Sequence, residues 1–469
     1  MINFILKMMV YNFIKLLIVE YFLFILSESK VIFVFEHYRH GARSPSDLFE
    51  NDLDLLKEKW NGNQELTNLG IRQEYLLGNF IRNKYPDLIN YEKYNPKEIG
   101  VFSTMTNRTI MSARAHINGI FNIAKKQKLN EKQKNTSIPY YLLNEIDQYN
   151  LINISLYPDY FAEEVPVHVV DFKEKLIQLE KNDYCPDIKK LRNKNKERKE
   201  IKDFIQKFND TFGKQLLDIY DIKDNKDFYM DYENVNDICI GIIINKFDDR
   251  KLNLFQNKID LEALHQTSQE FFKLKTTLVY ANDEEGNLGY IGASIFMRKI
   301  LSYMERIIND IKNNVNNSPK LVLFASHDTA ISNMEGILDS LFNIQPLAPT
   351  YASSYIFELV EERDNEYFVN FIFNNKTLKK VEYIDFKKKI ENDAWTYEQT
   401  GKYCGFIKED SDPIITPNDN INDDNNGEKS TWKIIIIVFS IINIVTIGVI
   451  IYLILKLKNK DLLKSIFKI

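Results

Sequence analysis

The sequence predicts an α/β domain whose central, mostly parallel sheet is flanked by helices and carries a smaller, mostly helical insertion. Two short runs, residues 31–36 and 320–326, are rich in apolar, β-branched and aromatic residues, as is typical of buried strands. Each run ends in polar residues that precede a helix-like stretch. In open parallel sheets, ligands collect at the carboxyl ends of strands, so the residues after these runs are the first candidates for a functional site.

The composition is that of a globular protein. The chain has 469 residues, and 61 basic against 66 acidic side chains give a formal net charge of −5. Hydrophobic residues at 44% and charged residues at 27% exclude wholesale disorder, collagen-like repeats and a multi-span membrane protein. A nucleic-acid binder would need a large cationic face, and the mild acidity argues against one. The length suggests two or three domains, or one α/β core with a large insertion.

Residues 30–407 form one continuous body in this prediction. Residues 66–85 have helical spacing, with Thr67 in the N-cap position, and residues 106–124 carry a second apolar stripe at helical spacing. Residues 137–277 are less regular and strongly charged. We assign them to the mostly helical insertion, which covers one end of the sheet.

The first 29 residues match a signal peptide. The apolar run at residues 16–26 is too short to cross about 30 Å of hydrocarbon. Ser27 and Ser29 follow it with the small-x-small spacing of a cleavage site. Glu20 interrupts the apolar run, so a start at a later methionine, or an uncleaved anchor, stays open.

The C-terminal part predicts a membrane anchor. Residues 434–455 are 22 residues without a charge, which is long enough for a transmembrane helix. Residues 456–469 contain five lysines and form a basic tail on the cytosolic side. Residues 408–433, rich in Asp and Asn, form an acidic, disordered stalk. This predicts a single-pass type I protein with a lumenal or extracellular body; the alternative, a buried core helix, would have nothing after it to cover it.

Asparagine triplets of the form Asn-x-Ser/Thr fit a secretory route, although they arise often by chance in an Asn-rich chain. They occur at Asn135, Asn153, Asn209, Asn316 and Asn375. The three cysteines exclude a disulfide-dense scaffold.

The sequence Arg-His-Gly-Ala-Arg-Ser-Pro, at residues 39–45, directly follows the first predicted strand. The guanidiniums of Arg39 and Arg43 flank the imidazole of His40, and Gly41 lets the backbone turn tightly beside it. Guanidinium groups match phosphate oxygens in bidentate geometry. Their fixed charges disfavour protonation of His40, so a ring nitrogen can stay unprotonated and nucleophilic. This combination suits attack on phosphorus, with the arginines neutralising charge on the oxygens.

The sequence Ser-His-Asp-Thr, at residues 326–329, follows the second predicted strand. A nucleophilic histidine needs a partner that protonates the departing alkoxide, and a carboxylic acid can do this. Asp328 is the candidate for this acid, and His327 is a candidate for a further hydrogen bond to phosphate. A His-Asp pair alone is weak support, but the two motifs follow matching strands.

Together these motifs resemble those of the histidine acid phosphatases, the larger branch of the histidine phosphatase superfamily, and most of all the lysosomal and prostatic type. RHGARSP matches the first family motif and SHDT matches the second. Residues 64–85 follow the family's helical pattern, and residues 103–109 resemble the segment that supplies a third phosphate-binding arginine, here Arg108. The resemblance extends from about residue 31 to residue 404.

The resemblance implies a phosphoglycerate-mutase-like core and a two-step hydrolysis of phosphate monoesters that needs no metal and no cofactor. His40 would attack phosphorus to form a phosphohistidine, and Asp328 would protonate the leaving oxygen. The phosphoryl group would be held by cationic and imidazole side chains: Arg39, Arg43, Arg108 and His327. Water would then hydrolyse the intermediate.

The resemblance also implies a disulfide between Cys185 and Cys404, and an acidic compartment such as the lysosomal lumen, or the cell surface. Dimerisation occurs in the family, which leaves a homodimer open. Met105 departs from the family pattern, because many relatives carry Asp there. Cys239 has no obvious partner. The triplet that begins at Asn107 is discounted as a glycosylation site, because a sugar beside Arg108 would obstruct the site.

The remaining histidines are expected to serve the structure. We expect His37 to pack or hydrogen-bond at the strand end, His116 to be structural and His265 to lie on the surface. For His168, in the loop before the insertion, a supporting role near the pocket stays open.

Three other functions are weaker candidates. A phytase-type member would act on inositol polyphosphates, but the modest net charge does not favour a highly anionic substrate. A receptor-like ectodomain could keep the fold and lack activity, although the motif residues are all intact. A mutase or phosphotransferase could use the same phosphohistidine, but those smaller relatives lack the RHGxRxP extension and the membrane span.

Overall fold

The computed structural model describes residues 29–44, 64–121, 127–128, 160–161, 165–170, 185–219, 230–232, 234–236, 238–239, 258–280, 288–347, 349–362, 366–405 and 407. These residues all belong to one compact unit, Ser29–Glu409. The predicted signal peptide up to residue 28, the stalk from residue 408, the span at residues 434–455 and the basic tail lie outside the described residues. None of the helices in the described ranges is long and apolar enough to cross a membrane.

A seven-stranded mixed sheet lies at the centre, with the strand order β5-β2-β6-β1-β7-β8-β9. Its strands are β1 (Lys30–Arg39), β2 (Ile99–Ser103), β5 (His168–Val169), β6 (Leu321–Ser326), β7 (Ser354–Glu361), β8 (Tyr367–Phe373) and β9 (Lys376–Glu382). The four strands from β5 to β1 are parallel, whereas β7, β8 and β9 add on as antiparallel neighbours. The expectation of a mostly parallel sheet is therefore wrong for this second half. Short hairpin connections make antiparallel pairing the natural choice there, because parallel neighbours need long crossovers.

Both predicted strands are present and pair with each other in parallel. Every residue of β6 is buried, and so are the last eight residues of β1, because helices cover both faces of the sheet. Alternate side chains of β1 enter different cores. Phe33 and Phe35 pack with the helices α12 (Leu288–Lys312) and α13 (Asp328–Phe342), while Val34 and Tyr38 pack on the opposite face.

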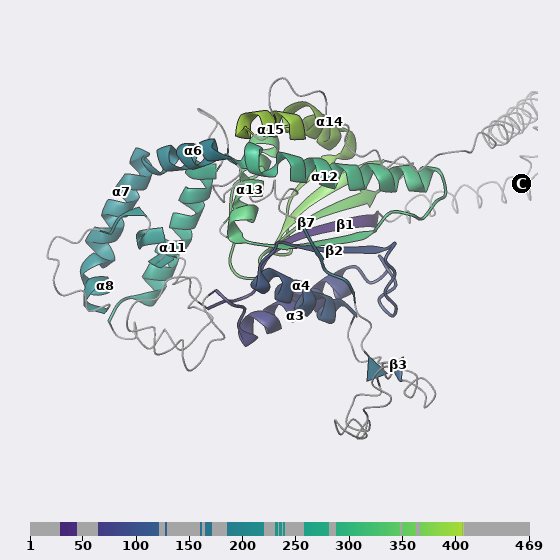
Figure 1. Ribbon diagram of the computed structural model, residues 1–469, viewed down its shortest axis with the longest axis horizontal. Helices are drawn as coiled ribbons and strands as arrows, with labels where there is room; N and C mark the ends of the chain where they lie inside the picture. Colours follow the sequence, from purple (N-terminus) through teal and green to yellow (C-terminus); the bar gives the residue numbers. More distant parts are fainter. Residues whose placement is uncertain are drawn as a thin grey trace, which may run out of the picture. The chain divides into compact units, whose positions relative to one another are not determined.

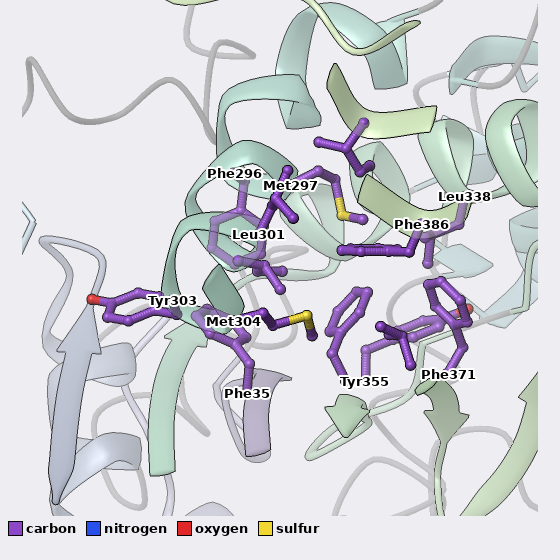
Figure 2. Close-up of a cluster of buried hydrophobic side chains, with 14 of the residues drawn as sticks. Phe35, Phe296, Met297, Leu301, Tyr303, Met304, Leu338, Tyr355, Phe371 and Phe386 are labelled. Atoms are coloured by element: carbon purple, nitrogen blue, oxygen red, sulfur yellow. The ribbon is translucent and has the colours of Figure 1, made fainter. Parts of the chain in front are cut away.

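The first core is aromatic and lies between the sheet and the helices α12, α13 and α14 (Tyr383–Asp393) (Figures 1 and 2). Phe35 of β1 meets Phe296 of α12 edge to face, with ring centroids 5.3 Å apart. Phe371 of β8 lies 6.0 Å from Phe386 of α14. Figure 2 shows these rings surrounding Met304, whose flexible side chain fills the space between them.

The opposite face of the sheet is covered by α3 (Asn68–Lys84) and α4 (Asn107–Phe121) (Figure 1). Both helices fall where their sequence spacing predicted them. Thr67 caps α3 as expected, because its side chain accepts a hydrogen bond from the backbone N–H of Gly70 at 3.1 Å.

A buried ionic cluster joins α3 and α4 to β1. His116 of α4 lies 3.1 Å from a carboxylate oxygen of Glu36 on β1 and 3.7 Å from one of Glu74 on α3, and all three side chains are fully buried. Burial would lower the pKa of His116, but the two carboxylates raise it to about 9. The ring of Tyr38 stacks on His116 at 4.5 Å. His116 is thus structural, as predicted.

The stretch predicted as the insertion contains a helical subdomain with its own apolar cluster. Its described helices are α6 (Pro186–Lys196), α7 (Lys199–Phe208), α8 (Lys214–Ile219) and α11 (Leu261–Lys275), with the π-helical turns η5 (Asn209–Gly213) and η6 (Thr276–Tyr280). A disulfide between Cys185 and Cys404 joins the start of α6 to α15 (Tyr397–Cys404), which is the predicted pair. Cys239 is buried and free. Strand β5 also falls within this stretch but belongs to the central sheet.

Three of the asparagine triplets fall on described residues. Asn316 and Asn375 are exposed. Asn209 is different, because its amide donates hydrogen bonds to the carbonyls of Ile205 and Met230, both at 2.9 Å. Its side chain is part of the packing of the helical subdomain.

Replacing the buried imidazole should destabilise the whole fold. His116→Ala leaves Glu36 and Glu74 buried without a cation, which typically costs about 3–5 kcal/mol. The pKa of His116 is raised from about 6.5 to about 9 on folding, so its stabilisation is complete below pH 6.5 and is lost as the pH rises toward 9. Urea unfolding at pH 6 and pH 9.5 measures the free energy of unfolding, and His116→Ala should lower it more at pH 6 than at pH 9.5. The exposed Asn118→Ala on the same helix should be nearly neutral at both.

Candidate functional site

Three parallel strands end at one edge of the sheet. Arg39, the last residue of β1, pairs with Ser326, the last residue of β6, and Ser103 at the end of β2 pairs with Ala325. The backbone N–H of His40 donates to the carbonyl of Ser326 at 2.9 Å, so the pairing continues one residue past the strand. Both motifs therefore meet at this edge, as their positions after matching strands predicted.

His40 is buried at this edge, with 1% of its surface exposed. Its Nδ1 lies 2.8 Å from the carbonyl oxygen of Gly41, an acceptor only, so Nδ1 carries the proton and donates it. In the neutral ring, Nε2 is then left with a lone pair. The ring lies edge to face with that of His327, with the centroids 5.4 Å apart, and 5.6 Å from the ring of Tyr351.

The pKa of His40 is held well below its usual value, first by burial and then by the charges of Arg39, Arg108 and Arg43. The expectation that fixed positive charge keeps this imidazole neutral is thus consistent with its surroundings. Burial is the largest single cause, which the sequence alone could not show.

A close approach of two backbones explains the glycine after His40. A Cβ atom at Gly41 would lie 2.4 Å from the carbonyl oxygen of Gly70 on α3, far inside van der Waals contact. Gly41 does not have a positive φ, so its role is the close approach and not the tight turn that we predicted. The N–H groups of Gly41 and Ala42 donate to Ser112 Oγ at 3.2 Å and Gln73 Oε1 at 2.9 Å, which ties the loop to α4 and α3.

The three predicted arginines gather around His40. Arg39 is 1% exposed; its Nη1 donates to the carbonyl of Pro349 at 2.8 Å and its Nη2 lies 3.7 Å from Asp328. Arg108, in the first turn of α4, places Nη2 3.2 Å from His327 Nδ1. Burial lowers the pKa of Arg108 to about 10, helped by the charge of Arg43. Among the described residues, the buried Nε–H groups of Arg39 and Arg108 have no hydrogen-bond partner.

Asp328 is the first residue of α13 and follows His327 at the end of β6. Burial would raise the pKa of its carboxyl, but the charges of Arg39, Lys275 and Arg43 outweigh burial and hold this pKa below the usual range. Asp328 is therefore ionised in the free site and balances part of the positive charge.

His327 connects β2 and α4 to the same edge. Its Nε2 lies 3.1 Å from Thr104 Oγ1, and this hydroxyl in turn bonds Thr109 at 3.0 Å. An Nδ1 that accepts from Arg108 and an Nε2–H that donates to Thr104 describe one neutral tautomer consistent with both contacts. The structure thus brings His40, Asp328, Arg39, Arg43, Arg108 and His327 to one place, as the sequence predicted.

Comparison with known proteins identifies the family of this chain. Residues 30–374 match the family model of the histidine phosphatase superfamily (branch 2), which covers most of the chain. The chain belongs to this family. It is similar to the prostatic acid phosphatase of Homo sapiens, with 25% identity over 72% of this chain and 76% of the relative. The lysosomal acid phosphatase of Homo sapiens is 27% identical over 72% of this chain and 70% of the relative.

Solved structures show the same fold. A phytase from Citrobacter braakii superposes with a TM-score of 0.52 at 14% identity, covering 77% of this chain and 97% of the phytase. A phytase from Hafnia alvei, in complex with myo-inositol hexakis sulphate, gives a TM-score of 0.51 at 12% identity, covering 78% and 98%. These similarities establish the fold only. The resemblance to the histidine acid phosphatases, predicted from the two motifs, is confirmed at the level of the family.

Sequence reasoning missed two side chains at this candidate site. Tyr351 places its ring 4.5 Å from the guanidinium carbon of Arg39. Residue 351 falls within the range over which the sequence resembles the family, and an aromatic residue there was the available signal. Lys275, at the end of α11, contributes positive charge at Asp328. Nothing in the sequence around Lys275 distinguishes it from other lysines of the subdomain.

The other histidines take different positions. His37 is buried, with Nε2 2.5 Å from Ser326 Oγ, and burial lowers its pKa to about 3. His265 is buried on α11, so the expectation of a surface position is wrong; its place on the inner side of an amphipathic helix is the reason. His168 is exposed on the short edge strand β5.

His40, which follows β1, and His116, on α4, should have pKa values shifted in opposite directions from the usual value of a histidine. The pKa of His40 is lowered, so its ring should stay neutral with the proton on Nδ1 at pH 5.5. The pKa of His116 is raised to about 9, so its ring should stay doubly protonated at pH 7.5. Nitrogen NMR of selectively labelled histidines, assigned with His40→Gln and His116→Gln, measures both states. A doubly protonated His40 at pH 5.5 would contradict this electrostatic description.

Proposed function

We propose that this protein is an acid phosphatase that hydrolyses phosphate monoesters through a phosphohistidine on His40, with Asp328 as proton donor. One observation carries the proposal. A buried imidazole with an unprotonated Nε2 shares its sheet edge with a carboxyl group and three guanidiniums, two of which have buried N–H groups without a partner among the described residues. A phosphoryl group is an anion of the size and hydrogen-bonding capacity that would satisfy these donors.

In the first step, His40 Nε2 attacks phosphorus, the N–P bond forms and the P–O bond to the leaving group breaks. Asp328 transfers its proton to the departing oxygen, which leaves as an alcohol. Arg39, Arg43 and Arg108 neutralise the charge that builds up on the non-bridging oxygens. The hydrogen bond from Nδ1 to Gly41 stabilises the positive charge that the ring gains on phosphorylation.

In the second step, water attacks the phosphohistidine. Asp328, now a carboxylate, accepts a proton from this water, the N–P bond breaks and inorganic phosphate is formed. His40 recovers its neutral ring, and Asp328 is again protonated. The same carboxyl group thus serves as acid and then as base.

The protonation of Asp328 depends on the substrate. In the free site, Arg39 and its neighbours hold the pKa of Asp328 below the usual range, so the group is ionised. A bound phosphoryl group brings negative charge, which offsets these cations and raises the pKa of Asp328 toward the protonated state that the first step needs. A substrate monoanion, which is more abundant at acidic pH, brings the required proton with it. An acidic pH optimum follows.

We further propose that the phosphatase body faces the lumen of an acidic vesicle such as the lysosome, or the cell surface, as a single-pass type I protein. The uncharged run at residues 434–455 and its basic flank support the anchor. Similarity to lysosomal acid phosphatases supports the compartment. General phosphate monoesters rank above inositol polyphosphates as substrates, because the phytase similarity extends to the fold alone.

Removing the nucleophile should abolish turnover. We expect the purified protein to release phosphate from an aryl phosphate at about pH 5, with or without a chelator, and His40→Ala to lower kcat by several orders of magnitude. Rapid quenching with a labelled substrate should trap a phosphoenzyme in the wild type and none in His40→Ala. A wild-type protein that releases no phosphate under these conditions would favour the inactive, receptor-like alternative.

Removing the acid should affect substrates unequally. Asp328→Ala should slow alkyl phosphates by about 10²–10⁴-fold, because an alkoxide is a poor leaving group without a proton donor. The kcat for aryl phosphates should fall much less, because phenolates leave more readily than alkoxides. The comparison uses kcat for both ester types at pH 5. Equal losses on the two types would assign the proton transfer to another group.

A further inference from the structure

The chain between α13 and β7 wraps around Arg39 and His40. In its described parts, residues 343–347 and 349–353, it contacts both of these residues through backbone and side-chain groups. The carbonyl of Pro349 accepts from Arg39 Nη1 at 2.8 Å, and the carbonyl of Ser353 accepts from the Arg39 backbone N–H at 2.9 Å. The N–H of Ala352 donates to the His40 carbonyl at 3.3 Å, and the Tyr351 ring covers the Arg39 guanidinium.

This segment determines the orientation of the Arg39 guanidinium. Its Nη1 is fixed by Pro349, its Nη2 faces Asp328 at 3.7 Å, and its buried Nε has no hydrogen-bond partner among the described residues. A displacement of the Pro349 carbonyl would therefore move the donors that Arg39 presents to an anion.

A buried carboxyl group on α13 forms a hydrogen bond with the backbone of the segment between α13 and β7. Glu335, two helical turns after Asp328 on α13, accepts at Oε1 a hydrogen bond from the backbone N–H of Leu347 at 2.9 Å. The same oxygen accepts from the hydroxyl of Tyr355, on β7, at 3.1 Å. Glu335 is completely buried, and its Oε2 has no partner among the described residues. One carboxyl oxygen thus connects the helix, the segment and the strand that follows it.

We propose that Glu335 is a positioning residue of the phosphate site. Its carboxyl group fixes the segment through Leu347, and the segment in turn fixes Arg39 through Pro349 and Tyr351. The proposal rests on the phosphate-binding function proposed above. It adds a residue outside the two motifs, one that touches no substrate.

The chemistry of the pocket around Glu335 is consistent with a neutral carboxyl group. Burial raises the pKa of Glu335 to about 8, partly offset by the hydrogen bonds from Leu347 and Tyr355, so the group is protonated at pH 5. The side chains that face it are uncharged at that pH. Burial keeps Tyr355 protonated by raising its pKa, and His37, which contacts the neighbouring Met334 from β1, has its pKa lowered to about 3. A glutamine could therefore replace Glu335 without changing the local charge.

The test compares two uncharged replacements of similar size at pH 5. Glu335→Gln keeps an oxygen that accepts from Leu347, whereas Glu335→Met fills the space without an acceptor. Met304→Ala, in the aromatic core on α12, is the control for general destabilisation. The first measurement is the Kd for inorganic phosphate by calorimetry, which does not require hydrolysis. The second is the split between KM and kcat for an aryl phosphate.

We expect Glu335→Met to weaken phosphate binding by about 10- to 10²-fold and to raise KM in parallel, because Arg39 is misplaced. Glu335→Gln should keep the Kd for phosphate and the KM near the wild-type values, and Met304→Ala should leave both unchanged. Glu335→Asp, which withdraws the carboxyl by one methylene, should raise the Kd for phosphate and the KM by less than Glu335→Met does. This variant replaces Glu335→Met in the test if the Met variant does not fold. Unchanged phosphate affinity in the Asp and Met variants would overturn the proposal. A wild type that binds phosphate without hydrolysing esters would refute the proposed activity while leaving this test intact.

Discussion

The parallel pairing of β1 with β6 is the constraint on which the site depends. Its register places Arg39 beside Ser326, so the two motifs begin their loops side by side although most of the chain separates them. Strand β2, on the far side of β6, brings Thr104 and then Arg108 to the same edge. Because side chains alternate along a strand, a slip of one residue in β1 would turn Arg39 to the opposite face.

A single electrostatic field explains the protonation states of His40 and Asp328. The clustered guanidiniums and the dry surroundings keep His40 neutral, and the same positive charges keep Asp328 ionised until an anion arrives. The field is unfavourable by itself, since three cations lie close together and the buried Nε–H groups of Arg39 and Arg108 have no partner in the part of the chain that the structure describes. Two well-packed cores and the Glu36–His116–Glu74 cluster provide the rigidity that holds this arrangement. The stabilising contacts thus lie around the sheet, whereas the unfavourable charges lie at its edge.

The fold and the site were predictable to different degrees. Local patterns were strong for β1, β6, α3 and α4, because short apolar runs and helical stripes depend on neighbouring residues alone. The antiparallel half of the sheet was missed, since pairing direction depends on contacts between distant segments. His265 was misplaced for the same reason: a lone histidine does not reveal which side of its helix is covered. The supporting contacts of Glu335 and Lys275 carry no local signal that sets these residues apart.

By itself, the sequence determined the family and named the six side chains that meet at the sheet edge, because motif residues and their order along the chain carry that information directly. The resemblance to the family implied the Cys185–Cys404 pair, which the structure contains. Only the tertiary structure decided that Gly41 is needed for a close approach to α3, that burial is the largest single cause keeping His40 neutral, and that a buried carboxyl on α13 holds the loop behind Arg39. The physical reason is that packing distance and loss of solvent are properties of the folded chain. They arise from residues that are far apart in sequence.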